Sequence, residues 1–225
     1  MFDYATARRG RYWNMPPYGP GILASLLRGM GVEVALVNLN HEVLKAAQAA
    51  PGPEAFDFEA VWRGALERTL NDFRPDLVGV SCMFTQAHRS TVAVCAAIKA
   101  WDPALPLALG GVHITNCLQS REQFAGVIAD YAMVDLFFLY ESELSFPAFV
   151  RAARGEIPAT ELFQVHFNRV RAAQPPKRRE PPAGPAMDVV PAYDLMQIQE
   201  LSAHGVIGSF FCLIEPRPRV AQTLL

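Results

Sequence analysis

Residues 77–83 read LVGVSCM, and the prediction of the fold starts from this stretch. It is a continuous apolar run of strand length, which is typical of a strand buried on both faces of a parallel sheet. Residues 74–76 (RPD) separate it from residues 54–73, whose apolar side chains recur at helical spacing. Residues 86–101 follow it with the same helical spacing. The strand is therefore predicted to lie between two helices.

The same alternation runs outward in both directions. Helices are predicted at residues 21–28, 54–73, 86–101, 121–129 and 142–153, and strands at residues 32–39, 77–83, 107–109 and 135–140. Short connections between alternating elements predict an α/β fold with an open, mostly parallel sheet covered by helices on both faces. In such a fold ligands bind beyond the carboxyl ends of the strands.

Composition excludes several classes of protein. The chain has 225 residues, with 20 Lys and Arg against 22 Asp and Glu, and its formal net charge is −2. Binding to nucleic acid or to anionic membranes would need a basic excess. No apolar run approaches the roughly 18 residues of a membrane span, and the N-terminus lacks the apolar segment of a secretory signal. We expect a cytoplasmic location.

The last third of the chain differs from the rest. Nine of the 18 prolines lie from Pro158 onward, so we expect a domain at residues 1–155 and an irregular, Pro-rich extension at residues 156–225. Within the extension, residues 162–170 favour one strand or a strand pair, residues 174–191 a linker, and residues 192–201 a short helix. Nothing strand-like precedes residue 21, so the first strand of the fold is expected to be missing.

Small or polar residues follow three of the predicted strands, where a ligand would bind. Ser81 lies inside an apolar strand, so its hydroxyl needs a partner from the backbone or from a ligand. Gly110 and Gly111 allow a ligand to approach the backbone closely, although a tight turn is the more usual reason for such a pair. His113 is either a ligand contact or an exposed loop histidine.

Two carboxylates follow the strand at residues 135–140. Glu141 and Glu143 suit a general acid/base pair, and they also suit the capping of the next helix. No catalytic residue can be assigned on these grounds.

The cysteines do not indicate a metal site. Cys82, Cys95, Cys117 and Cys212 lack Cys-x-x-Cys spacing, so neither zinc nor an iron–sulfur cluster is indicated. Cys82 and Cys95 are expected in the core. There is no Gly-x-Gly-x-x-Gly or phosphate-binding loop. The residues alone predict an α/β domain that binds a small molecule.

The order of the motifs adds a family resemblance. The chain reads PPYG (residues 16–19), then RPDLVGVSCMFT, DPALPLALGGVHIT and VDLFFLYESELSFPAFVRAARG, and later DVVPAYDLM. This series, over about residues 14–155, resembles the N-terminal cobalamin-binding domain of cobalamin-dependent radical SAM enzymes. The resemblance implies a Rossmann-like sheet that holds cobalamin with the nucleotide tail beside it.

The resemblance also implies a set of binding positions. The tail pocket would contain small and polar residues, as a flat base in an apolar slot requires. Residues 140–143 (YESE) stand where the family has a Gly-Glu-Gly-Glu-like sequence, so the carboxylates match and the glycines do not. The loop at residues 6–18 stands where the family's chain approaches the corrin. The cofactor-binding positions carried over are Pro17, Gly19, Ser81, Met83, Thr85, Gly110, Gly111, His113, Glu141 and Glu143.

The family's Cys-x-x-x-Cys-x-x-Cys motif is absent from the chain. Three thiolates are needed to hold the cluster, so the iron–sulfur cluster and S-adenosylmethionine are expected only in a full-length parent or on a separate radical SAM polypeptide. The parent is expected to be a methyltransferase. This chain is expected to bind cobalamin without catalysing the reaction alone, and no histidine is assigned as a cobalt ligand.

Two other interpretations stay open. One is a non-catalytic, receiver-like interaction module, which would need an Asp at the end of the central strand, where this chain has none. The other is a nonfunctional remnant that folds poorly, favoured by the apolar segment at residues 205–214 with no barrel to cover it.

Overall fold

The computed structural model describes residues 4–8, 16–168 and 189–204. The chain divides into two compact units, which are described separately. The sheet unit comprises residues 22–34 and 73–190, and the helical unit comprises residues 1–21, 35–72 and 191–225. Helix α2 (Tyr18–Gly29) begins in the helical unit and ends in the sheet unit.

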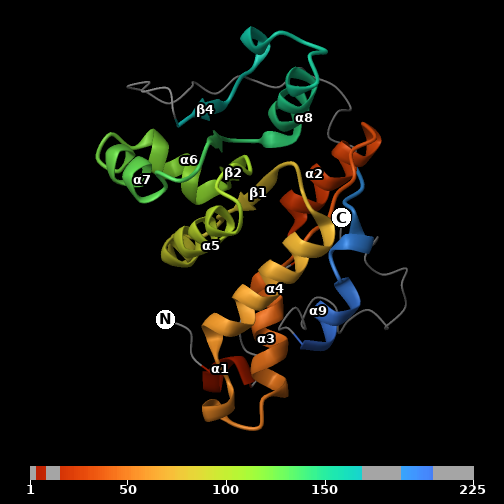
Figure 1. Ribbon diagram of the computed structural model, residues 1–225, viewed down its shortest axis with the longest axis vertical. Coiled ribbons are helices and arrows are strands. Elements are labelled where there is room, and N and C mark those ends of the chain that lie inside the picture. The colour runs from red at the N-terminus through yellow and green to blue at the C-terminus, as the bar shows by residue number, and fades with distance from the viewer. Residues whose placement is uncertain (1–3, 9–15, 169–188, 205–225) are drawn as a thin grey trace. The chain divides into compact units, whose positions relative to one another are not determined.

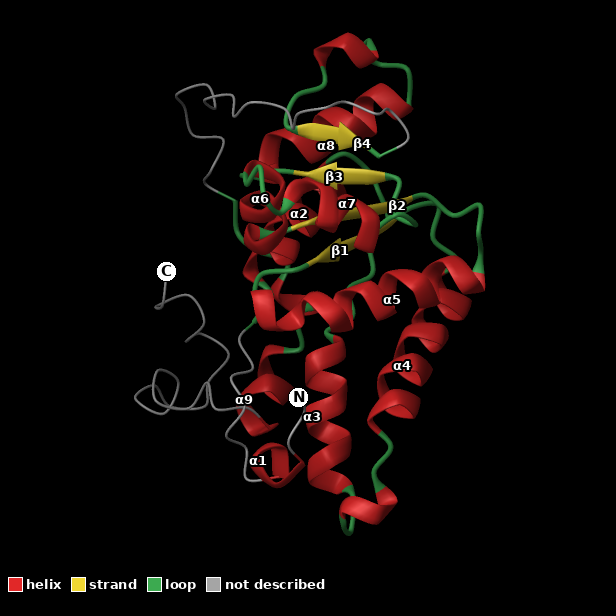
Figure 2. Ribbon diagram, turned by 90° about the vertical axis from the view of Figure 1, so that its left-hand side faces the viewer, coloured by secondary structure: helices red, strands yellow, loops and turns green. Residues whose placement is uncertain are grey.

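Four strands form the sheet, in the order β1, β2, β3 and β4 (Figure 2). The first three are parallel, with Ser81 beside Gly110 at the ends of β1 and β2, and β4 runs antiparallel to β3. The expectation of a mostly parallel sheet is confirmed. The strands are β1 (Val78–Ser81), β2 (Leu107–Gly110), β3 (Leu136–Phe138) and β4 (Val165–Phe167).

Helices cover both faces of this sheet, as the alternating sequence predicts (Figure 1). On one face Ala108 and Phe138 pack against Leu27 of α2 and Phe146 of α8. On the other face, α5 and α6 contact β2, and the ring of Phe137 lies edge-on to Tyr131, which follows α7. The helices are α5 (His88–Trp101), α6 (Val112–Gln119), α7 (Phe124–Asp130) and α8 (Ser142–Ala153).

The predicted strand at residues 32–39 is wrong. Residues 32–38 belong to no strand, and α3 (Leu39–Ala49) begins where the strand was expected to end. Asn38 caps this helix, because its side chain accepts a hydrogen bond from the backbone N–H of His41. Val32 and Val34 still pack against the core. The apolar residues of this segment are therefore partly buried, although its backbone is not paired with a strand of the sheet.

Strand β1 is less buried than its apolar sequence suggests. It is the outer strand of the sheet, and exposure alternates along it, with Gly79 and Ser81 exposed. Alternate residues of a strand share one face, so one face of β1 is open to solvent, and the prediction of a strand buried on both faces is wrong for this strand.

The helical unit contains α1 (Tyr4–Arg8), α3, α4 (Phe58–Phe73) and α9 (Ile198–His204). Ala7 of α1 packs with Leu44 and Ala47 of α3. The ammonium group of Lys45 lies 2.8 Å from a carboxylate oxygen of Glu200, which ties α9 to α3.

The remaining predicted elements agree with the structure apart from their ends. The helix expected at residues 54–73 is a short 3-10 turn, η1 (Pro53–Ala55), followed by α4. The helix expected at residues 86–101 is η2 (Thr85–Ala87) followed by α5. Among the described residues, the other 3-10 turns are η3 (Ala159–Glu161) and η5 (Tyr193–Leu195). Most of the expected linker at residues 174–191 lies outside the described residues. None of the described helices has the length and apolar character needed to cross a membrane.

Candidate functional site

Backbone hydrogen bonds join the carboxyl ends of β1 and β2. The N–H of Cys82 donates to the carbonyl of Gly110 over 2.8 Å, and the N–H of His113 donates to the carbonyl of Cys82 over 3.2 Å. Ser81 pairs with Gly110 at the end of the ladder. These bonds bring together four predicted site residues, Ser81, Gly110, Gly111 and His113, and the carboxyl ends of β1 and β2 with the start of α6 are called the strand-end site below.

Gly111 is required by the chain's own backbone. Its φ of 106° and ψ of 164° lie in a region that is essentially restricted to glycine. A Cβ there would lie 2.7 Å from the carbonyl carbon and 2.9 Å from the nitrogen of Cys82. A Cβ on Gly110 would meet the carbonyl oxygen of Phe138 at 3.3 Å. The backbone therefore requires glycine at position 111 and leaves little room for a side chain at position 110. Contact of either glycine with a cofactor stays a prediction.

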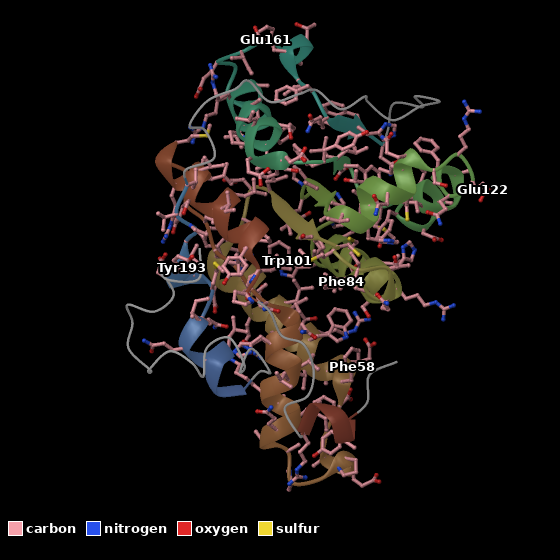
Figure 3. All side chains as sticks on the ribbon, turned by 180° about the vertical axis from the view of Figure 1, so that it is seen from behind. Phe58, Phe84, Trp101, Glu122, Glu161 and Tyr193 are labelled. Atoms are coloured by element: carbon pink, nitrogen blue, oxygen red, sulfur yellow. The ribbon has the colours of Figure 1, made fainter. Side chains whose placement is uncertain are left out.

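The strand-end site exposes large apolar side chains. Met83 is 53% exposed, Phe84 is 59% exposed and Val112 is 57% exposed. Phe84, labelled in Figure 3, follows β1 and precedes η2. Ser81 is exposed rather than enclosed in a buried strand, so its hydroxyl is available at this edge. Apolar surface with a few hydroxyl groups suits a flat, mostly apolar ligand.

Polar groups also gather after β3. The backbone N–H of Tyr140 donates to the hydroxyl of Thr115 over 2.9 Å, which links this strand end to α6. Glu141 precedes α8 without a side-chain capping bond, so the capping interpretation fails for it. One carboxylate oxygen of Glu143 is buried with no hydrogen-bond partner among the described residues. Such a group needs a donor from water or a ligand.

Tyr140 adopts a backbone conformation that favours glycine. Its φ is 61°, in the left-handed region that residues other than Gly, Asn and Asp rarely adopt. The glycine in the corresponding motif of the resembled family would adopt this conformation without strain.

His113 lies in α6 and is buried, so the prediction of an exposed loop histidine at this position is wrong. Its Nδ1 lies 3.2 Å from the hydroxyl of Thr85, and its Nε2 lies 2.9 Å from Nδ1 of His88. Nε2 of His88 lies 3.0 Å from a carboxylate oxygen of Asp130. Burial, with a smaller contribution from His88, lowers the pKa of His113. The sequence gives little sign of His88 and Asp130, because only the packing of three helices brings them together.

The other predicted positions are not joined to this site. Pro17 and Gly19 belong to the helical unit, at the start of α2, so their role stays a prediction. Cys82 and Cys95 are buried and free, as expected. Burial raises the pKa of the Cys95 thiol to about 12, which keeps it protonated. Cys212 lies outside the described residues. In the described part of the chain, no group of three or more His, Cys, Asp or Glu side chains could hold a metal ion.

A cavity of about 460 Å³ lies at the opposite ends of the strands. Lys99 and Asp135 line it and form an ion pair of 2.6 Å. The Lys99 ammonium also donates to the carbonyl of Leu105, and the Asp135 carboxylate accepts the N–H of Leu107. These groups satisfy one another, so the cavity shows no sign of a binding site.

Comparisons with known proteins fit this geometry. The model of the B12-binding domain family matches residues 11–134. The chain is also 24% identical over 146 residues to a cytidylyl-2-hydroxyethylphosphonate methyltransferase from Streptomyces wedmorensis, covering 65% of this chain and 26% of that protein. The chain thus spans about a quarter of the length of this relative. No solved structure matches the chain.

Proposed function

The chain belongs to the B12-binding domain family, and from that premise we propose that its strand-end site binds cobalamin. The observation that supports this most is the exposed apolar group of Met83, Phe84 and Val112 beside the hydroxyl groups of Ser81 and Thr85. Open α/β sheets bind their ligands at this edge.

The described residues suit the cofactor chemically. The apolar side chains would pack against the flat base of the nucleotide tail, and the two hydroxyls would orient it by hydrogen bonds. Glu143 offers a buried carboxylate oxygen that lacks a donor among the described residues. Bound cobalamin would supply a cobalt centre that carries a methyl group. The residues of this chain would bind and orient the cofactor.

We place the chain within a larger methyl-transferring system. The similarity to a methyltransferase supports this, and it covers about a quarter of that protein. The radical SAM parentage implied by the motif series belongs to the same proposal. In it, the iron–sulfur cluster and S-adenosylmethionine would be bound outside this chain, for example by a separate radical SAM polypeptide.

Binding of hydroxocobalamin to the purified chain tests the proposal. We expect a saturable change in the visible spectrum and retention of cobalamin on desalting. Ser81→Trp should weaken binding about tenfold or more, a loss of about 1.4 kcal/mol, by filling the exposed edge after β1. Ala100→Trp is the matched control, because Ala100 is an exposed small residue near the end of α5.

Two results would overturn the proposal. One is the absence of binding to wild-type chain that melts cooperatively. The other is equal weakening by Ser81→Trp and Ala100→Trp, which would show that bound cobalamin does not occupy the strand-end site.

A further inference from the structure

Four side chains form an unbroken row of hydrogen bonds that ends at the strand-end site. The row runs from Asp130 to His88 over 3.0 Å, from His88 to His113 over 2.9 Å, and from His113 to Thr85 over 3.2 Å. Its members come from α7, α5, α6 and η2. Asp130 is largely exposed at one end and His113 is buried in the middle.

The hydrogen-bond chemistry gives this row a direction. An ionised carboxylate can only accept, so the hydrogen of neutral His88 must be on Nε2, facing Asp130. Nδ1 of His88 then accepts, so His113 must donate from its own Nε2. Nδ1 of His113 is left as an acceptor. The hydroxyl of Thr85 must therefore donate its hydrogen to His113.

Neighbouring groups favour this arrangement. The thiol of Cys117 lies 3.5 Å from Nδ1 of His113 and can act there as a second, weak donor. The lowered pKa of buried His113 favours its neutral form, which the row requires.

The direction of the row decides what Thr85 can offer to a ligand. A threonine hydroxyl has one hydrogen and two lone pairs. Its hydrogen points to His113, so the exposed side of Thr85 can only accept. A ligand group that meets it must be a donor. Without the row, the hydroxyl could rotate and serve either a donor or an acceptor.

We propose that Asp130 and His88 are positioning residues that act through His113 to make Thr85 a hydrogen-bond acceptor for a donor group of the ligand. This inference rests on the proposed binding of cobalamin at the strand-end site. Cobalamin offers two kinds of donor, the amide N–H groups of the corrin side chains and the ribose hydroxyls of the nucleotide tail.

The direction of the row can be measured without a ligand. Nitrogen-15 spectra of the imidazole rings at pH 7.5 distinguish the two neutral tautomers, and His→Gln variants assign the signals. We expect the Nε2–H form for both His88 and His113. Asp130→Ala should allow the other tautomer of His88 to appear, whereas Glu122→Ala should leave both spectra unchanged. Glu122 is an exposed acidic residue just before α7.

Binding measurements test the role of the hydroxyl. Thr85→Val keeps the shape and removes the acceptor, and we expect it to weaken hydroxocobalamin binding about tenfold. Thr85→Ser should restore most of the affinity. Cobinamide, which lacks the nucleotide tail, separates the two donors. An equal loss for cobinamide and cobalamin identifies a corrin amide, and a loss for cobalamin alone identifies the tail hydroxyl.

Each part of the proposal has an outcome that overturns it. An Nδ1–H form of His113 in the wild-type chain would show that His113 donates to Thr85, which contradicts the proposed direction of the hydrogen bonds. Equal affinity of Thr85→Val and wild type would show that the hydroxyl does not meet the ligand. If wild-type chain binds no cobalamin, the proposed function fails together with the role of Thr85 toward this ligand. The imidazole spectra still decide the direction of the row in that case.

Discussion

Replacing Gly111 with alanine is expected to destabilise the sheet unit strongly. Gly111 precedes α6 with a φ of 106°, and its Cα faces the backbone of Cys82. The added Cβ would lie 2.7 Å from the carbonyl carbon of Cys82 and 2.9 Å from its nitrogen. Those are backbone atoms, so a rotation of a side chain cannot relieve the overlap.

Two contributions set the size of the effect. Holding an alanine in this region of φ and ψ costs about 1–3 kcal/mol. Moving the backbone of Cys82 away would break its two hydrogen bonds, to Gly110 and from His113, at about 1 kcal/mol each. We therefore expect Gly111→Ala to lower the free energy of unfolding by about 3–5 kcal/mol, against a total of about 5–15 kcal/mol for a typical domain.

Urea unfolding followed by circular dichroism measures this difference. Gly79→Ala is the matched control, because Gly79 lies in β1 and a Cβ there would meet nothing within 4 Å. We expect the control to change the free energy by less than about 0.5 kcal/mol. If Gly111→Ala were as stable as Gly79→Ala, the close approach of α6 to the end of β1 would be wrong.

Three further substitutions test other parts of the sheet unit. Tyr140→Gly should be more stable than Tyr140→Ala by about 1 kcal/mol, since only the glycine relieves the φ of 61°; equal unfolding midpoints would refute the strain. Burial lowers the pKa of His166, so the unfolded chain takes up the proton first as the pH falls. Stability should therefore drop as the pH falls below about 6.5, and unfolding midpoints at pH 7.5 and 5.5 should differ less for His166→Phe. Asp135→Ala removes the partner of Lys99, which is mostly buried, and should cost about 3 kcal/mol in urea unfolding; a loss below about 1 kcal/mol would mean that the pair is solvated.

Most helices could be predicted from the sequence because their apolar residues recur at regular spacing over long stretches. The parallel strands could be predicted because each is a short apolar run between helices. The strand predicted at residues 32–39 failed for a physical reason. A β-branched apolar run indicates an extended, buried backbone, but a strand also needs a hydrogen-bonded neighbour, and the described residues provide none for it. Asn38 was an available signal, because an asparagine before residues 39–49 is a typical helix cap.

The candidate site was only partly predictable. Ser81, Gly110 and His113 could be grouped from sequence, since parallel strands end at one edge of a sheet. The burial of His113 could not be foreseen, because the loop expected after β2 is the first turn of α6. Its contact with His88, and the contact of His88 with Asp130, depend on how α5, α6 and α7 pack, over separations of 25 and 42 residues. Local patterns carry no information on such contacts.

The hydrogen bonds between Cys82, Gly110 and His113 have a consequence for how a ligand would be recognised. They fix the two strand ends to α6 during folding, so this edge is preorganised before any ligand arrives. Ordering of loops and side chains is one of the main entropic penalties of association. At this edge the entropic penalty of ordering the backbone is incurred during folding and not during binding. Binding should therefore proceed as the docking of a ligand onto a rigid surface.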